Sequence, residues 1–176
     1  MSETLSLIRL AAEHRLLLLS MIEDFKFAEE NLFSQRILDL IQSDFDAFLK
    51  QLRDSEVERR LPEGRVPQSV LWLMQNRSVL LGLINLRHRL TQSLEHHGGH
   101  IGYFIRPSER EKGYGTRMLI LALDEARKLG LSQVLMTCNT DNLSSARGIE
   151  KNGGVLASQG ISDVSGKLIS RYWITL

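Results

Sequence analysis

The N-terminal segment 4–10, TLSLIRL, alternates polar and apolar residues, and this period of two predicts a first strand. Residues 13–28 are rich in leucine and predict a helix. From Ser34 the apolar residues recur every three or four positions as far as Leu52. This spacing predicts a further helix with Ser34 as its N-cap.

In the middle of the chain the hydrophobic pattern changes from the helical period of 3.6 residues to patterns typical of strands. Residues 63–67, EGRVP, interrupt the helical pattern and predict a loop. Segments 69–75 and 78–86 predict two strands that QNRS joins as a hairpin. The stretch 97–107, HGGHIGYFIRP, predicts another strand after a glycine-rich start.

The C-terminal part returns to alternating helices and strands. A helix with Met118 and Ala122 on one face should end at Gly130, and the short strand SQVLMTCN follows it. NLSSARGIEKN predicts a helix, and two strands complete the chain. This order predicts a single α/β (α+β) domain over residues 1–176, with a right-handed crossover in its centre.

Composition narrows the class of protein. Of the 176 residues, 43% are hydrophobic and 24% are charged, which favours a folded core over disorder. The formal net charge is +1, so the chain lacks the basic excess of most nucleic-acid binders, although a local basic patch stays open.

The N-terminus and the single cysteine bear on the compartment. The longest apolar run near the N-terminus, Leu16 to Leu19, is too short for a signal or a membrane span, and one cysteine allows no internal disulfide. We therefore expect a cytoplasmic protein that contacts neither membrane nor nucleic acid.

Two glycines open the helix that follows the strand ending at Pro107. Free N–H groups at a helix start form an anion site, and glycines at positions 113 and 115 let a ligand approach them closely. Three basic residues surround the turn, so a diphosphate is the expected ligand: Arg110, Lys112 and Arg117.

Spacing separates this turn from two common phosphate motifs. A P-loop needs Gly-Lys-Ser/Thr, but Gly115 is followed by Thr116 and Arg117. A dinucleotide fingerprint needs a small residue where Met118 stands. Neither motif fits, although a nucleotide-phosphate binder unrelated to acyl transfer stays an alternative.

The pattern that does fit is Arg-x-x-Gly-x-Gly, REKGYG at residues 110–115. Together with GHIGYFIRPSEREKGYGTRML and NTDNLSSARGIEKNGG, it resembles the GCN5-related N-acetyltransferase (GNAT) superfamily, and within it a group of predicted bacterial acetyltransferases. The resemblance is specific over residues 99–154. It implies a mixed sheet of about six or seven strands with about four helices, in which two parallel central strands splay apart.

The resemblance also implies acetyl-CoA as the co-substrate. The backbone of Phe104 and Ile105 would pair with the pantetheine arm, and a backbone N–H there would hold the thioester oxygen. The amides from Glu111 through Lys112, Gly113, Tyr114 and Gly115 to Thr116 would hold the diphosphate, beside Arg110. Asn142 and Ser145 match the family's asparagine and small-residue positions, and Asn142 equally fits a helix N-cap.

Two positions depart from the family pattern. Ile149 stands where a tyrosine commonly protonates the leaving thiolate, and Gly154 replaces a phenylalanine. Ser145, Cys138 or water could take the tyrosine's part, or the thiolate could leave unassisted, because a thiol pKa is about 8.5. The departure keeps a non-catalytic coenzyme A-binding regulatory module open as the alternative function.

A general base would help an amine acceptor, which is mostly protonated near neutral pH. His100 stands where many relatives have a glutamate, and its imidazole would titrate in the right range. A histidine that is simply hydrogen-bonded at a strand start fits as well. Tyr103 and Glu95 are weaker candidates for a catalytic role.

We expect no metal site. His96, His97 and His100 lie close in sequence, but their spacing places them on different faces and no cysteine or carboxylate pattern joins them. Cys138 lacks a recognisable partner base, so we expect direct transfer rather than an acyl-cysteine.

The acceptor is expected to be a small-molecule or peptide amine. The helices within residues 13–58 should border its site, and their acidic residues would either attract a cation or be simply solvated. Homodimers occur among look-alikes, and no sequence feature decides the oligomeric state.

Overall fold

A computed structural model describes residues 3–176 of the chain. These residues form two sheets, one of four strands in the order β1-β2-β3-β4 and one of three in the order β5-β7-β6. The strands are β1 (Leu5–Ile8), β2 (Gln68–Gln75), β3 (Val79–Arg87), β4 (Ile101–Ile105), β5 (Gln133–Asn139), β6 (Val155–Ile161) and β7 (Leu168–Thr175). All pairings within the two sheets are antiparallel.

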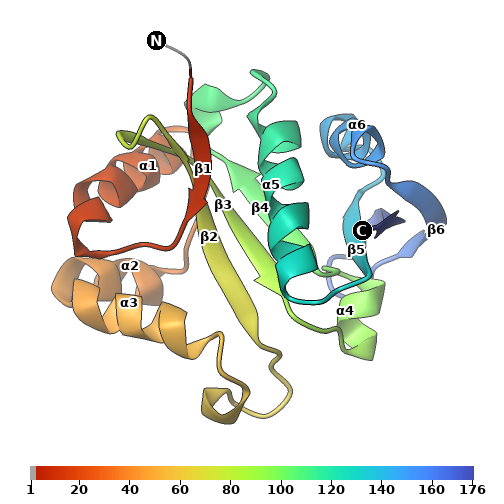
Figure 1. The fold of residues 1–176 in the computed structure, drawn as a ribbon, viewed down its shortest axis with the longest axis horizontal. Helices are drawn as coiled ribbons and strands as arrows, with labels where there is room; N and C mark the ends of the chain where they lie inside the picture. The colour runs from red at the N-terminus through yellow and green to blue at the C-terminus, as the bar shows by residue number, and fades with distance from the viewer. Residues whose placement is uncertain (1–2) are drawn as a thin grey trace.

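Helices cover both faces of the four-stranded sheet (Figure 1). On one side lie α1 (Arg15–Phe27), α2 (Gln35–Ser43) and α3 (Phe45–Asp54), whose buried residues pack against β2 and β3 around Trp72. On the other side α5 (Tyr114–Lys128) forms a second core with Met118 and Ala122. The remaining helices are α4 (Gln92–His96) and α6 (Leu143–Lys151).

The predicted α/β fold and its seven strands are confirmed. The hairpin joining β2 and β3 has positive φ angles at Asn76 and Arg77, the backbone of a tight type I′ turn. The loop that was predicted at residues 63–67 lies between α3 and β2.

One helix prediction and one strand prediction were wrong in detail. The helix predicted from Ser34 to Leu52 is broken at Asp44, whose backbone leaves the helical region while its carboxylate caps α3 through the Ala47 amide. The strand predicted at residues 97–107 is shorter, and the unpredicted helix α4 precedes it, capped by Thr91. A five-residue helix offers too little periodicity to be read from sequence.

None of the helices within residues 3–176 has the length and apolarity needed to cross a bilayer.

Candidate active site

The two sheets separate between β4 and β5, which together border a wedge. No ladder joins these strands, although α5 connects them in sequence. They meet at one end only, where the His100 N–H donates to the Leu135 carbonyl over 2.7 Å. The splayed pair of strands implied by the resemblance is therefore present.

Gly99 closes the narrow end of the wedge. Its φ is +63°, and a Cβ there would lie 2.3 Å from the Leu135 carbonyl oxygen. Only glycine fits a backbone that approaches another backbone so closely. Three residues further along, at Gly102 in β4, no atom lies within 4 Å of an ideal Cβ. There is therefore open space beside this part of the strand.

The register of β4 decides which of its backbone groups face the wedge. Arg106 N–H donates to the Leu81 carbonyl and Arg87 N–H donates to the His100 carbonyl. In an antiparallel pair these bonds alternate, so Gly102 and Phe104 direct their amides toward β3. The amides of Tyr103 and Ile105 consequently point into the wedge, where sequence reasoning expected those of Phe104 and Ile105.

Phe104 instead offers its side chain. The residue is 46% exposed and lies on β4, the edge strand of the four-stranded sheet that borders the wedge. By strand alternation Phe104 and Gly102 face the α1–α3 side, opposite the Tyr103 ring, which packs with the α5 core. An exposed aromatic ring beside open space gives this side of the wedge an apolar contact surface.

The glycine turn presents a run of free donors at the other end of the wedge. Gly113 adopts a left-handed backbone, φ +82°, as N-cap of α5. Within residues 3–176, the amides from Glu111 to Thr116 donate to no protein acceptor, and the first bonded amide is that of Arg117, to Gly113. Six consecutive unpaired N–H groups at a helix start are an anion-binding arrangement.

Gly115 lies against β4. An ideal Cβ at this residue would be 3.3 Å from Cε2 of Tyr103 and 3.7 Å from Cγ1 of Ile105. Glycine here therefore lets the start of α5 approach the strand whose amides face the wedge, so that the anion-binding turn and the free strand edge adjoin.

The basic side chains around the turn are held by carboxylates. Arg110 makes a bidentate pair with Glu30, at 2.6 and 2.7 Å, and also donates to the Ile105 carbonyl over 3.2 Å. These contacts fasten the turn to the segment that follows α1. The basic residues and their acidic partners are Arg110 with Glu30, Lys112 with Glu109 and Arg117 with Glu3. The unengaged positive potential of the turn thus comes from its amides.

Tyr103 reaches from β4 to the junction of α5 and α6. Its hydroxyl oxygen lies 3.6 Å from an ideal Cβ at Gly148, in the middle of α6. Burial raises the pKa of the Tyr103 phenol, and the nearby Ser145 side chain partly opposes that shift. The phenol therefore stays protonated at neutral pH and can donate a hydrogen bond or a proton.

The start of α6 brings Asn142 and Ser145 together. The Asn142 side chain accepts from the Ser145 amide over 3.0 Å, so Asn142 caps the helix. Ile149 is only 1% exposed and belongs to the core, and a Cβ at Gly154 would lie 2.4 Å from its Cγ2. The two departures from the family pattern therefore fit each other as packing partners.

His100 is buried at the narrow end, with 7% of its surface exposed. Its Nδ1 accepts the Leu135 N–H over 2.9 Å, and its ring stacks edge-on against Trp173. Burial lowers the pKa of the imidazole, and the Arg87 charge lowers it further. His100 is therefore neutral, with its Nδ1 lone pair already engaged and its proton on Nε2.

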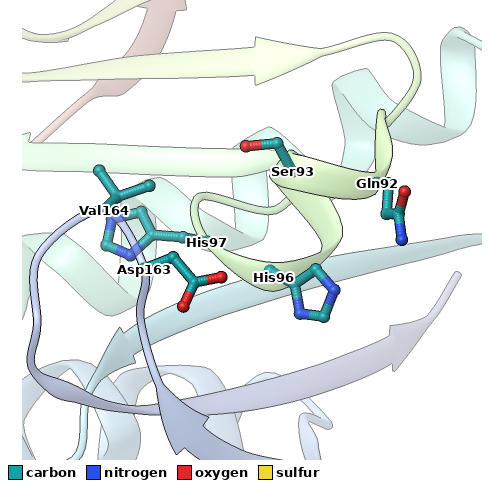
Figure 2. A pocket seen from close by; sticks show the side chains of 6 residues that line it. All are labelled: Gln92, Ser93, His96, His97, Asp163 and Val164. Carbon is teal, nitrogen blue, oxygen red and sulfur yellow. The ribbon is translucent and has the colours of Figure 1, made fainter.

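The other two histidines of the cluster serve different contacts. A cavity of about 330 Å³ lies between α4 and the β6–β7 loop. Figure 2 shows the side chains that line it, with the His96 and His97 rings pointing in different directions. His97 Nδ1 bonds the Ser162 hydroxyl at 2.6 Å. In the part of the chain that the structure describes, no three His, Cys, Asp or Glu side chains are grouped to hold a metal ion.

Cys138 lies on β5, partly buried. Burial raises the pKa of its thiol, and the Glu150 and Asp141 carboxylates raise it further. The residue is consequently a protonated thiol at neutral pH and a poor nucleophile.

The chain matches the sequence model of a family described as an acetyltransferase (GNAT) domain over residues 36–155, which is more than half of its length. No curated protein matches it in sequence.

Solved structures match it along nearly its whole length. RimJ of Mycobacterium smegmatis, in complex with CoA-disulfide, is 13% identical with a TM-score of 0.70, over 97% of this chain and 81% of that one. The microcin C7 self-immunity acetyltransferase MccE, in complex with acetyl-CoA and AMP, is 16% identical with a TM-score of 0.64, over 98% and 92%. Mutant forms of the spermidine/spermine N-acetyltransferase SpeG of Vibrio cholerae are 15% identical, with a TM-score of 0.62, over 98% and 95%.

Proposed function

Because the chain belongs to the GNAT acetyltransferase family, we propose that it transfers the acetyl group of acetyl-CoA directly to an amine of its acceptor. The observation that carries this proposal is the row of six unpaired amides from Glu111 to Thr116, adjoining a strand edge that is also unpaired. A diphosphate and an extended amide-containing arm are the ligand groups that satisfy such donors.

The chain's residues would divide the cofactor between them. The turn amides from Glu111 to Thr116 would hold the diphosphate, and Tyr103 and Ile105 would bond the pantetheine arm through their backbone. Phe104 would contribute its exposed ring as an apolar contact. Arg110 would act by bracing the turn against Glu30, since its guanidinium is already engaged.

The proposed reaction needs no acyl-enzyme intermediate. The uncharged amine nitrogen bonds to the thioester carbon, the carbon–sulfur bond breaks, and the sulfur leaves as thiolate. The nitrogen gives its proton to water at the open side of the wedge. Tyr103, with Ser145 beside it, would supply the hydrogen-bond donor for the departing sulfur. The high pKa of this phenol suits a donor, and it takes the part that Ile149 cannot take.

We assign His100 to holding the strands together rather than to proton abstraction. A base needs a free lone pair, and the Nδ1 lone pair of His100 is bonded to the Leu135 amide. An alkylamine has a pKa of about 10.4, so removing its proton at pH 7 costs roughly 4–5 kcal/mol. Water at the open side of the wedge would have to accept this proton.

The acceptor class is proposed to be an amine, in keeping with the spermidine/spermine N-acetyltransferase activity that the name of SpeG gives for that protein. Mass spectrometry of reactions with acetyl-CoA and a broad amine panel tests the proposal. Acetylated product with release of free coenzyme A is expected. Tight cofactor binding without turnover on any amine would instead indicate a coenzyme A-binding regulatory module.

A further inference from the structure

A second cavity opens beside the narrow end of the wedge, and arginines dominate it. Its volume is about 670 Å³, and its wall brings together α2, α3, the loop before β2, the end of β3 and α4. These elements all lie in the lower half of the view in Figure 1, with α2 and α3 on the left and α4 on the right. We call it the arginine cavity; its polar lining includes Arg36, Arg60, Arg65, Arg87, Asp54 and Gln68.

The charges of this cavity do not cancel. Asp54 is its one carboxylate among the described residues, and it is already paired with Arg60 and with Lys50. The other three arginines have no carboxylate within ion-pair distance anywhere in residues 3–176; they are Arg36, Arg65 and Arg87.

Arg87 is the innermost of the three. Its Nη1 donates to the carbonyls of Gly99 at 2.9 Å and Gly98 at 3.3 Å, and its other guanidinium nitrogens bond nothing within residues 3–176. Burial lowers the pKa of Arg87, and the nearby charge of Arg65 lowers it further. Arg87 is thus a partly buried cation with a second cation, Arg65, near enough to affect it, and an anion bound beside both would be stabilised by both charges.

The cavity lies within reach of the reacting centre. Arg87 faces the α1–α3 side of β3, two residues beyond Asn85, which pairs with Gly102 in the open part of β4. Same-face neighbours in a strand are about 7 Å apart. A short acceptor could therefore place its amine beside Gly102 and Phe104 while its other end contacts Arg87.

We propose that the arginine cavity binds an anionic group of the acceptor, so that the acceptor is an amine carrying a carboxylate or a phosphate several bonds from its nitrogen. The proposal rests on the acetyl transfer proposed above. Guanidinium forks match the paired oxygens of both anions, and a purely cationic amine would be repelled by the same groups.

Matched amines test the proposal and separate the two anions. Using the full chain with acetyl-CoA, kcat/KM is compared for 6-aminohexanoate against hexylamine and for O-phosphoethanolamine against ethanolamine. At least one anionic member should exceed its uncharged-tail partner by about tenfold, and the arm that does so identifies carboxylate or phosphate. Equal rates for both members of both pairs, or a preference for spermidine, would overturn the proposal.

Variants locate the effect. Arg87→Gln should raise KM for the anionic amine about ten- to hundredfold, the equivalent of losing a hydrogen bond to a charged group, with KM for acetyl-CoA unchanged. Arg65→Gln, in the exposed loop, should raise it about two- to fivefold and keeps the test sound if Arg87→Gln fails to fold. The control Arg53→Gln removes an equal charge from an exposed position of α3 outside the cavity and should change neither KM.

A binding measurement without acetyl-CoA keeps the two proposals apart. Calorimetric titration of O-phosphoethanolamine and 6-aminohexanoate into wild type, Arg65→Gln and Arg87→Gln reports on the cavity alone. Arginine-dependent binding in a chain that does not bind acetyl-CoA would uphold the cavity and refute the acetyl transfer. Acetyl transfer that no arginine variant affects would do the reverse.

Discussion

The two ends of the wedge differ in the kind of hydrogen-bond donor that they offer to a ligand. At the wide end the donors are backbone amides, from Glu111 to Thr116, and the neighbouring basic side chains are engaged by carboxylates. At the narrow end the backbone is closed by Gly99 and His100, and the unpaired groups are arginine side chains. We propose the backbone site for acetyl-CoA and the side-chain site for the anionic group of the acceptor.

Disrupting the backbone contact that closes the narrow end should lower the free energy of unfolding more than any other change proposed here. Gly99→Ala places a Cβ 2.3 Å from the Leu135 carbonyl at a positive φ, so the unfolding free energy should fall by more than about 3 kcal/mol. Urea denaturation measures the change. The matched control Gly102→Ala, three residues later in β4 with open space at its Cβ, should leave stability within about 1 kcal/mol of wild type.

A substitution at the wide end should instead lower the affinity for acetyl-CoA. Gly115→Glu would place a carboxylate between the turn and Tyr103, and acetyl-CoA affinity should fall at least about a hundredfold, or about 2.7 kcal/mol. Calorimetry measures the affinity. Ile120→Glu adds the same charge to the exposed side of α5 and should bind as wild type does; equal losses in both variants would argue against the placement of the diphosphate.

Removing the imidazole distinguishes a clamp from a base. His100→Ala leaves the Leu135 amide without its partner and should cost about 1–3 kcal/mol of stability. Any limb of the pH–rate profile near neutrality should survive the substitution. His96→Ala, on the exposed surface of α4, is the control for stability. A lost pH limb with unchanged stability would restore His100 as the general base.

The same histidine predicts a pH dependence of folding. Its pKa is lowered in the fold from an ordinary value of 6.5, so the folded state binds fewer protons than the unfolded state as the pH falls below 6.5. This contribution to stability is fully present above that pH and is lost toward the lower folded pKa. His100→Ala should flatten the decline of unfolding free energy between pH 7.5 and pH 5.5.

The smallest expected effect concerns the brace at the wide end. Glu30→Gln releases the Arg110 guanidinium, and because exposed ion pairs are worth about 0.2–1 kcal/mol, acetyl-CoA affinity should rise by no more than about fivefold. Titrations at two salt concentrations check it. Glu23→Gln, which breaks a pair with Lys26 on the same helix, should have no effect on affinity. A large loss of affinity in Glu30→Gln would show that the brace, rather than the amides, shapes the site.

The glycine turn at the wide end could be predicted from the sequence, because a site built from backbone amides requires glycines at particular positions. Gly113 and Gly115 stand one residue apart in the same turn, so one short stretch of sequence shows both, although the close approach of Gly115 to β4 is made only by the fold. The succession of strands along the chain followed from the period of two in the same way. These features are local, so a single stretch of chain records them.

The contacts at the narrow end could not be predicted from the sequence in this way. Arg65 and Arg87 are ordinary residues of a loop and a strand end, and only the packing of α3 and α4 on the sheet brings them together. The engagement of His100 by Leu135 depends on a residue 35 positions away. The break at Asp44 escaped notice because the apolar positions keep their helical spacing on both sides of it.

The central claim is that acetyl-CoA binds the free amides and the strand edge of the wedge. Thermal unfolding with acetyl-CoA, coenzyme A, ATP and NAD, each at a hundred times its expected dissociation constant, tests it most directly. A bound ligand should add about 2.7 kcal/mol, a rise in Tm of roughly 5–10 °C for a domain of this size. We predict this rise with the two coenzyme A compounds alone; an equal rise with ATP or NAD, or none with acetyl-CoA, would contradict the claim.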